Sequence, residues 1–390
     1  MTSIDSSNSS VPHKHPPAGK LEKTARRPHG ATNDCSAVAA LHLPGLWLDE
    51  LRDWLVAEGL QRFRADQLVE WIYTKGAASF DEMTNLSKSL RARLKECCQL
   101  YTSKTLKEAR SEDGTRKLLL QWLDGATCET VWIPEQNRHT ACLSSQIGCA
   151  VGCRFCASGV AGVRRNLTAG EIVEQALRVA GMVRSTTTAA DPPTRLTNIV
   201  MMGMGEPLAN YDALIKAVRI INAPWGLNIG ARRITISTVG LPQQIRRLAR
   251  EDLQLNLALS LHAPNQALRA ELIPSSQVPI SDLIDACNEY FQRTGREITL
   301  EYVLLDGVNH QPLHARQLAG IAKRLRCNVN LLRYNPVPDL PYGRPSSTTT
   351  YEFQRRLRDQ GVNAHVRTSR GRDIEAACGQ LRRRTAESGP

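Results

Sequence analysis

The chain has 390 residues, 42% of them hydrophobic, which is enough to bury a sizeable core in two or three domains. It contains no apolar run of membrane-spanning length and no apolar signal-peptide centre, so we expect a cytoplasmic protein without a membrane partner. The formal net charge of +12 favours a polyanionic partner such as nucleic acid, and eleven cysteines without a secretion signal favour reduced thiols over a disulfide framework.

Residues 1–44 are rich in Ser, Pro, His and basic residues and lack apolar periodicity, so they are predicted to form a disordered arm. A short polar tail is expected over residues 383–390 at the other end.

A small helical domain is predicted over residues 46–100. The stretches "LWLDELRDWLVAEGL" and "FRADQLVEWIYTKG" carry apolar residues at helical spacing and end at Gly59 and Gly76, and a third helical unit is capped near Ser87. Six basic side chains in this domain either contact phosphates or form a solvated helix face: Arg62, Arg64, Lys75, Lys88, Arg91 and Arg93.

Residues 101–137 are predicted to form an antiparallel β extension. The runs "TRKLLLQWL" and "CETVWIP" are rich in strand-forming residues, and Asp113-Gly114 and Asp124-Gly125 are turn signals beside them. A meander of short strands is the expected result.

Strands and helices alternate over residues 138–382. Predicted strands are "LTNIVMM", "RITIST", "LQLNLALSLH", "ITLEYVLL", "VNLLRY" and "VNAHVR", with "ACLSSQ" ahead of them. Predicted helices lie at 168–184, 210–222, 280–293, 311–325 and 351–360. This alternation indicates an α/β fold class with a parallel sheet closed into a barrel or part-barrel, whose chemistry lies at the carboxyl ends of the strands.

Three cysteines, Cys149, Cys153 and Cys156, lie close together in "SSQIGCAVGCRFCASG". A structural zinc site needs four ligands, usually two separated pairs, whereas a [4Fe–4S] cluster with three thiolates keeps one iron free for a ligand. The C-x3-C-x2-C spacing, with Phe155 before the last cysteine, resembles the radical S-adenosylmethionine superfamily. Zinc or another structural metal is the alternative.

A glycine-rich loop, "MMGMGEP", follows the predicted strand "LTNIV". Gly205 permits a close approach of backbone to a ligand, and Glu206 can accept hydrogen bonds from an ammonium group; an ordinary turn is the alternative. Four more polar residues lie at the ends of predicted strands: Ser237, Ser260, His262 and Asn335. They either contact a cofactor there or form hydrogen bonds to backbone.

The motifs together are similar to those of the RlmN family of radical S-adenosylmethionine RNA methyltransferases. The segments "FRADQLVEWIY", "FDEMTNLSKSLR", "ETVWIPE", "CLSSQIGCAVGCRFC", "GMGEPLAN", "ISTVGLP", "LSLHAP" and "DIEAACGQL" occur in family order between about residues 46 and 382. The resemblance implies a partial (βα)6 radical-SAM barrel with the helical domain and the β-meander attached. It also implies methylation of carbon 2 of adenine 2503 in 23S rRNA and of adenine 37 in tRNAs.

The resemblance also assigns roles to residues. It implies one [4Fe–4S] cluster on Cys149, Cys153 and Cys156, S-adenosylmethionine as exchangeable ligand, and Cys378 as the carrier of a methyl group. Cys142 would resolve the RNA adduct through a transient disulfide with Cys378, and Glu129 would be the proton acceptor. The residues expected to contact S-adenosylmethionine are Gly205, Glu206, Ser237, Ser260, Leu261, His262 and Asn335.

Two other functions fit parts of this sequence. A sister group methylates carbon 8 of the same ribosomal adenine and shares the cluster and both cysteines, but the intact helical domain favours carbon 2. A cluster-containing RNA-binding protein without methyl transfer would need neither Cys142 nor Cys378. The expected partners are 23S rRNA, tRNA and an electron donor such as flavodoxin, and the expected state is a monomer.

Overall fold

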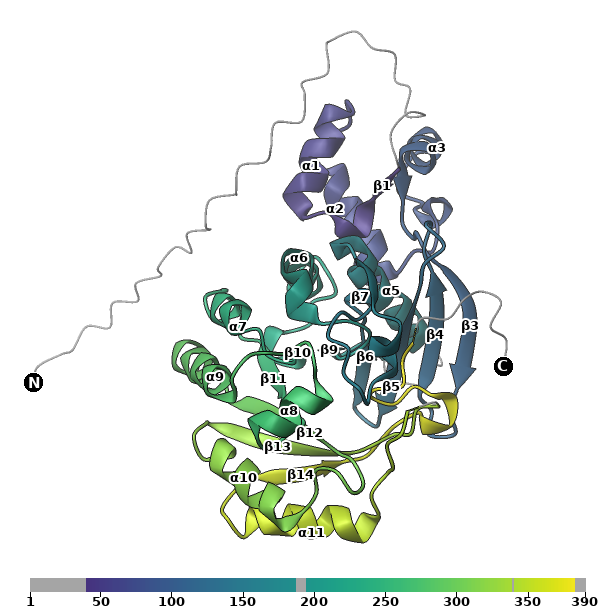
Figure 1. The fold of residues 1–390 in the computed structure, drawn as a ribbon. Coiled ribbons are helices and arrows are strands. Elements are labelled where there is room, and N and C mark those ends of the chain that lie inside the picture. The colour runs from purple at the N-terminus through teal and green to yellow at the C-terminus, as the bar shows by residue number, and fades with distance from the viewer. Residues whose placement is uncertain (1–39, 187–193, 339, 383–390) are drawn as a thin grey trace, which may run out of the picture. The chain divides into compact units, whose positions relative to one another are not determined.

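The computed structural model describes residues 40–186, 194–338 and 340–382 (Figure 1). The predicted arm lies outside the described residues except for its last five, and the predicted tail lies wholly outside them. Leu41 and His42 already form a strand, so regular structure begins a few residues before the predicted start at 46. Among the described residues, no helix combines the length and the apolar character needed to cross a membrane.

The predicted helical domain is helical in the structure. Its elements are β1 (Leu41–His42), η2 (Leu43–Gly45), α1 (Leu48–Ala57), α2 (Arg64–Val69), η3 (Glu70–Lys75), η4 (Phe80–Glu82), α3 (Lys88–Cys97) and β2 (Cys98–Gln99). Gly59 and Gly76 adopt φ values of 71° and 70°, and the Ser87 hydroxyl accepts a hydrogen bond from Leu90 N. Both glycines therefore act as the predicted helix stops, and Ser87 is the predicted cap.

One sheet of ten strands organises the rest of the described chain, in the order β14-β13-β12-β11-β10-β9-β6-β5-β4-β3. The antiparallel part is β3 (Lys104–Arg110), β4 (Arg116–Gln121), β5 (Thr127–Glu135) and β6 (Arg138–Cys142). The parallel part continues from β6 through β9 (Asn198–Met201), β10 (Ile234–Thr238), β11 (Asn256–Ser260), β12 (Ile298–Leu304), β13 (Cys327–Arg333) and β14 (Ala364–Arg367). β3 and β14 do not pair with each other, so the barrel is open, as predicted.

Helices follow the parallel strands in alternation. They are α4 (Ala157–Val160), α5 (Ala169–Ser185), α6 (Tyr211–Asn222), α7 (Pro242–Leu248), α8 (Gln266–Leu272), α9 (Ile280–Thr294), α10 (Pro312–Ala322) and α11 (Ser347–Arg358). Short elements complete the list: β7 (Gln146–Gly148), β8 (Val163–Asn166), η5 (Pro207–Asn210), η6 (Ala231–Arg233) and η7 (Arg372–Ile374). Figure 1 shows α6, α7 and α9 ranged in chain order along one side of the parallel strands. The α/β fold class is confirmed: β14 is the predicted strand "VNAHVR", and β6, which overlaps "ACLSSQ", brings the parallel part to seven strands, one more than in a partial (βα)6 barrel.

The chain after β14 returns to the antiparallel meander. Asp113 Oδ2 accepts a hydrogen bond from Gly371 N at 3.0 Å, and Ser111 Oγ donates to Asp373 Oδ1 at 2.5 Å. We call residues 371–382 the C-terminal segment; in Figure 1 it is the yellow chain beside β4 and β5. It connects the two ends of the open sheet. The division into separate domains at 46–100, 101–137 and 138–382 stays a prediction.

Candidate active site

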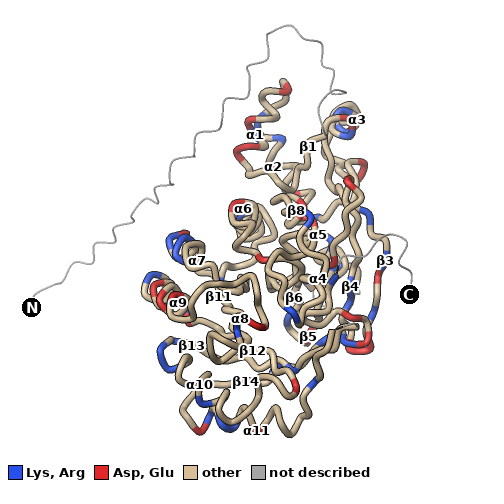
Figure 2. Tube along the Cα trace, in the orientation of Figure 1, with Lys and Arg blue, Asp and Glu red and all other residues tan. Residues whose placement is uncertain are grey.

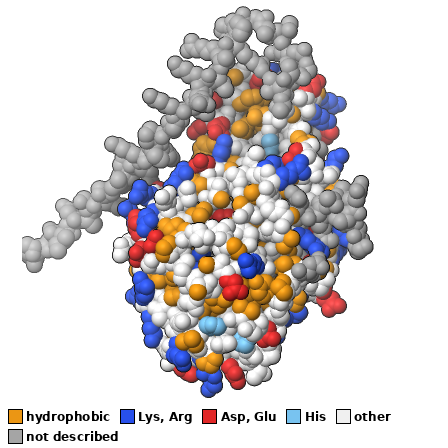
Figure 3. Space-filling model, viewed as in Figure 1, with side chains coloured by type: hydrophobic (Ala, Val, Ile, Leu, Met, Phe, Trp, Pro, Cys, Tyr) orange, Lys and Arg blue, Asp and Glu red, His pale blue; other side chains and the backbone are white. Residues whose placement is uncertain are grey.

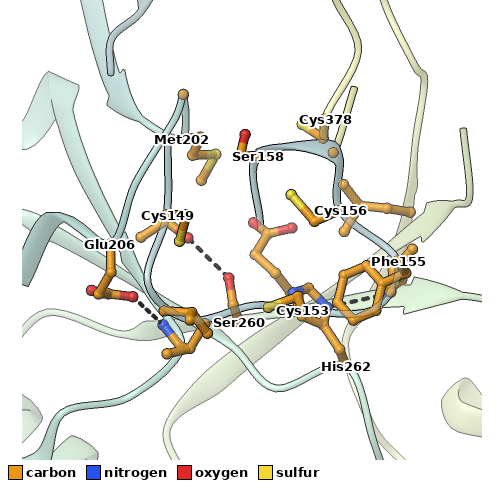
Figure 4. A pocket seen from close by; sticks show the side chains of 18 of the residues that line it. Cys149, Cys153, Phe155, Cys156, Ser158, Met202, Glu206, Ser260, His262 and Cys378 are labelled. Atoms are coloured by element: carbon orange, nitrogen blue, oxygen red, sulfur yellow. Dashed lines mark hydrogen bonds between the residues drawn. The ribbon is translucent and has the colours of Figure 1, made fainter. Parts of the chain in front are cut away.

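A cavity lies at the carboxyl ends of the parallel strands (Figure 4). It is lined by the three clustered cysteines, by the loop after β9, by the ends of β10 to β13 and by part of the C-terminal segment. The predicted residues among its lining are Cys149, Cys153, Cys156, Gly205, Glu206, Ser237, Ser260, His262, Asn335 and Cys378. The sequence motifs, which are spread along the whole core, therefore meet in one place.

The cysteine loop is fixed from both sides by other parts of the fold. Leu272 O accepts a hydrogen bond from Arg154 N at 3.0 Å, and the Ser275 hydroxyl donates to Val151 O. The Phe155 ring packs edge-on against His262, with their centroids 5.0 Å apart. Because the loop is held through backbone and through Phe155, its thiols are left to face the cavity.

The thiols suit an iron–sulfur cluster. All three are free, and burial raises the pKa of Cys149 to about 11 and raises those of Cys153 and Cys156. Bound iron would supply the positive charge that such buried thiolates need. Within the described ranges, no three His, Cys, Asp or Glu side chains converge on one single-ion position. In a [4Fe–4S] cluster each thiolate binds a different iron, so the three sulfurs need not converge on one metal position.

The glycine-rich loop brings backbone close to the strand that precedes the cysteines. Gly205 has a φ of 101°, and a Cβ on it would lie 2.6 Å from Gln146 Cβ. Glu206 follows, with one carboxylate oxygen accepting from Leu208 N at 3.0 Å and the other from Val239 N at 2.9 Å. Burial raises the pKa of Glu206, and these backbone donors oppose that shift. The arrangement holds a carboxylate in the cavity wall, ready for a cationic ligand group.

Gly205→Ala should destabilise the protein by about 2 kcal/mol, because the new methyl group would meet Gln146 and because φ of 101° is strained for alanine. Thermal unfolding measures the effect. Gly320→Ala is the control, since a Cβ on Gly320 in α10 meets nothing within 4 Å and should stabilise the helix slightly. Equal unfolding temperatures for the two variants would contradict the steric argument.

The strand-end residues line the same cavity from β10, β11 and β13. Ser237 Oγ and Ser260 Oγ lie 3.1 Å apart, and His262 Nδ1 accepts from Val303 N at 3.2 Å. Burial, with a smaller contribution from Arg269, lowers the pKa of His262 to about 3, so its ring is neutral at physiological pH. Leu261 differs from its neighbours: its side chain is fully buried and does not line the cavity, so its predicted cofactor contact rests on backbone alone.

Cys378 is held over the cavity by three hydrogen bonds to its segment. Asn335 Nδ2 donates to Cys378 O at 3.2 Å, Ala157 N donates to Gly379 O at 2.8 Å, and Ser158 Oγ donates to Leu381 O at 2.6 Å. Although Cys378 is accessible to solvent, it lies inside the cavity mouth, and burial among protein atoms raises its pKa to about 11. The segment is thus hydrogen-bonded to Ala157 and Ser158, the two residues that directly follow the last cluster cysteine.

Cys142 ends β6 and is buried. A second, adjoining cavity is lined by both Cys142 and Cys378, together with Met202, Glu301 and Asn335. Burial, and then the neighbouring Cys378, raises the pKa of Cys142. Two thiols that are far apart in sequence therefore face one space.

Glu129 lies outside both of these cavities. It is 1% exposed in β5, with Oε1 2.9 Å from Lys117 Nζ and Oε2 accepting from Arg382 N at 2.9 Å. Lys117 Nζ also donates to Glu375 O at 2.8 Å, and Ser144 Oγ donates to Glu129 O at 2.6 Å. The ion pair and its hydrogen bonds thus tie the C-terminal segment to β4 and β5, and Ser144 ties β5 to the connection between β6 and β7. Lys117 was not among the predicted site residues. The one sign of it in the sequence is a charged residue inside the apolar strand "RKLLLQ".

Lys117→Met should cost about 3 kcal/mol of unfolding free energy, because it leaves the buried Glu129 carboxylate without its ammonium partner. It should also loosen the C-terminal segment, so that iodoacetamide alkylates Cys378 faster. Urea unfolding and mass spectrometry of the alkylated peptide measure both effects. Lys216→Met is the control, since the exposed Lys216–Glu50 pair at 2.7 Å contributes at most about 1 kcal/mol. A loss no larger than that of the control would contradict the role of the pair.

Comparisons with known proteins agree with this architecture. Residues 41–100 match the family model of the ribosomal RNA large subunit methyltransferase N-terminal domain, and residues 143–318 match that of the radical SAM superfamily. The chain is 46% identical to a probable dual-specificity RNA methyltransferase RlmN of Geobacillus kaustophilus, over 86% of this chain and 91% of the relative. The corresponding protein of Rhodopirellula baltica is also 46% identical, over 89% of this chain and 92% of its own length.

A solved structure has the same fold. The crystal structure of a radical SAM methyltransferase from Sphaerobacter thermophilus superposes with a TM-score of 0.85 at 48% identity. The match covers 88% of this chain and 99% of that one. The likeness therefore includes both the open barrel and the N-terminal helices.

Proposed function

Because the chain belongs to the RlmN family of radical S-adenosylmethionine RNA methyltransferases, we propose that it methylates carbon 2 of adenine 2503 in 23S rRNA and of adenine 37 in tRNAs. The observation that carries the proposal is the meeting of Cys142 and Cys378 in one cavity, beside the cavity of the three clustered cysteines. An RNA-binding protein without methyl transfer has no need for this pair.

The cofactors of this superfamily fit the cavity. The [4Fe–4S] cluster would be held by Cys149, Cys153 and Cys156. The Glu206 carboxylate would accept hydrogen bonds from the amino group of S-adenosylmethionine. Ser237, Ser260, His262, Asn335 and the backbone at Gly205 and Leu261 would complete the S-adenosylmethionine site. When bound, the two cofactors supply a carbon-centred radical, which an electron-poor carbon such as adenine carbon 2 requires.

The chain's own thiols would carry the one-carbon unit. Cys378 would hold it as a methyl group on sulfur and, after loss of a hydrogen atom, join it to carbon 2 of the adenine. Once the adduct has returned one electron to the cluster and lost the carbon 2 proton, the Cys142 thiolate would attack Cys378 sulfur. The electron pair of the sulfur–carbon bond would stay on the methylene carbon, which would take up a proton, and the methylated base would leave as the disulfide forms. The shared cavity supports this order, because Cys142 faces Cys378 but does not line the cofactor cavity.

Glu129 would accept the proton that leaves carbon 2. In this structure both of its carboxylate oxygens are engaged, one by Lys117 Nζ and one by Arg382 N. The proposal therefore requires the C-terminal segment to shift when RNA is bound, so that Arg382 N releases the carboxylate. Glu129 is buried and is bonded to the segment that carries Cys378, and both facts support a role as proton acceptor over that of a solvent-facing surface residue.

The experiment is mass spectrometry of nucleosides from a 23S rRNA fragment and a tRNA, each incubated with the reconstituted enzyme, S-adenosylmethionine and a reductant. We expect 2-methyladenosine from both RNAs, identified against 2-methyl and 8-methyl standards. Formation of 8-methyladenosine would overturn the position of methylation. Cleavage of S-adenosylmethionine without any methylated adenosine would overturn the reaction itself.

The same proposal includes RNA, an external electron donor, a cytoplasmic location where these RNAs occur, and a monomeric enzyme. The net charge of +12 supports RNA binding, and Figure 3 shows Lys and Arg side chains spread over the viewed face with apolar side chains between them.

Affinity for the rRNA fragment should fall roughly tenfold or more between 50 and 200 mM salt, because phosphate contacts release counterions. Filter binding at several salt concentrations measures this slope, and a flat slope would contradict electrostatic docking.

A further inference from the structure

The cysteine loop has an outer side as well as an inner one. A hollow that opens to solvent is lined by Gly152, Cys153, Arg154, Val160 and Tyr342 among others. Cys153 also lines the inner cavity. Cys153 therefore borders both the solvent-facing hollow and the cofactor cavity.

Large apolar side chains are exposed at this hollow, on β8 just after it and on the β4–β5 turn that contacts β8. Val160, which lines it, is 69% exposed, Val163 is 41% exposed and Leu123 is 74% exposed; they are three of the eight large exposed apolar residues in the described part of the chain. The turn that holds Leu123 reaches β8, because Arg164 Nη2 donates to Asp124 O at 3.3 Å. We call Leu123, Arg154, Val160, Val163 and Arg164 the outer patch.

The rim of the outer patch is basic. Arg154 and Arg164 are exposed, and Figure 2 shows the basic colour at β8. Two acids lie near the patch. Asp124 is paired with Arg165 at 2.7 Å. The other is Glu271: burial raises the pKa of Tyr342, Arg154 opposes that rise, and Glu271 adds to it. An apolar centre with a positive rim is typical of a surface that binds an acidic protein.

We propose that the outer patch is the docking surface for an acidic one-electron carrier protein whose redox group lies near its own surface. This inference rests on the proposed function, in which the cluster must receive an electron. The donor's flavin or iron–sulfur group would lose one electron, and the cluster behind Cys153 would gain it. RNA is the less suitable occupant, because exposed valine and leucine side chains offer nothing to phosphates.

Reduced flavodoxin is the probe, and stopped-flow absorbance of the cluster in the reconstituted full-length enzyme is the readout. Arg154→Glu and Val160→Asp should each slow cluster reduction by flavodoxin about tenfold or more, because they place negative charge in the interface. Reduction by dithionite, a small ion that needs no docking surface, should stay within about twofold of the parent rate. Added salt should slow flavodoxin in the parent protein and have less effect in Arg154→Glu.

Matched controls lie on the far helices. Arg356→Glu reverses an exposed arginine on α11, and Leu313→Asp places a charge on a 49% exposed leucine of α10. Both should leave flavodoxin-driven reduction unchanged. Patch variants that keep the parent flavodoxin rate would overturn the proposal, and so would variants that lose RNA affinity alone. Methylation driven by dithionite tests the proposed function separately, so its failure is distinguishable from failure of docking.

Discussion

A Cys142→Ala protein incubated with RNA, S-adenosylmethionine and a reductant should accumulate protein joined covalently to RNA through Cys378. The variant keeps the carrier thiol and every residue of the cofactor cavity, because Cys142 lines only the adjoining one. It lacks the sulfur that would break the adduct. Cys378→Ala has no carrier and should form no adduct at all. A nuclease-sensitive band of higher mass on a denaturing gel, mapped to Cys378 by mass spectrometry, measures the difference.

Stability alone does not separate these two variants, so a third is needed. Cys287→Ala removes a fully buried thiol from α9 that lines neither cavity. Each of the three substitutions should cost about 1 kcal/mol of unfolding free energy. The Cys287→Ala protein should nevertheless release methylated RNA normally. A folded, cluster-loaded Cys142→Ala protein without trapped RNA would refute the division of roles between the two cysteines.

Cys153→Ala should bind no stable [4Fe–4S] cluster, and reductive cleavage of S-adenosylmethionine should fall to background. Among the described residues, three thiols line the cofactor cavity besides Cys378, which belongs to the C-terminal segment and not to the cysteine loop. Loss of one leaves two ligands for four irons. Iron and sulfide analysis after anaerobic reconstitution measures the cluster, and release of 5′-deoxyadenosine measures cleavage.

Cys327→Ala is the matched control for that experiment, since Cys327 is a half-buried thiol on β13 whose Sγ lies 3.5 Å from Ala322 O. It should reconstitute like the parent protein. Continued cleavage of S-adenosylmethionine by Cys153→Ala would mean that this cysteine is not a cluster ligand.

Much of the fold could be predicted from local patterns. Apolar periodicity predicted α5, α6 and α9 to within one residue at each end, because each buries one face against the sheet. β3 was missed since its residues are almost all exposed, and no apolar alternation marks it. The predicted helix at 351–360 begins earlier, at Ser347, because Ser346 Oγ accepts from Thr349 N and caps it there.

The site divides in the same way. Spacing alone identified the three clustered cysteines, because one short loop carries them. The meeting of Cys142 and Cys378 and the contact of Lys117 with Glu375 O join residues from opposite ends of the core, so no local pattern contains them. The first came from family resemblance, and the second needed the structure.

The return of the C-terminal segment to the meander also places the last-synthesised part of the described chain against strands made much earlier. The ribosome makes β3 to β14, the cysteine loop and the glycine-rich loop before it makes the residues that bridge the open barrel. Cys378 is thus made after the three cluster cysteines, and its segment binds Asp113, Lys117 and Glu129 through Gly371 N, Glu375 O and Arg382 N. A chain without this segment would keep Cys149, Cys153, Cys156 and the glycine-rich loop but would lack Cys378, so under the proposed mechanism it could form a radical and yet have no thiol to join it to RNA.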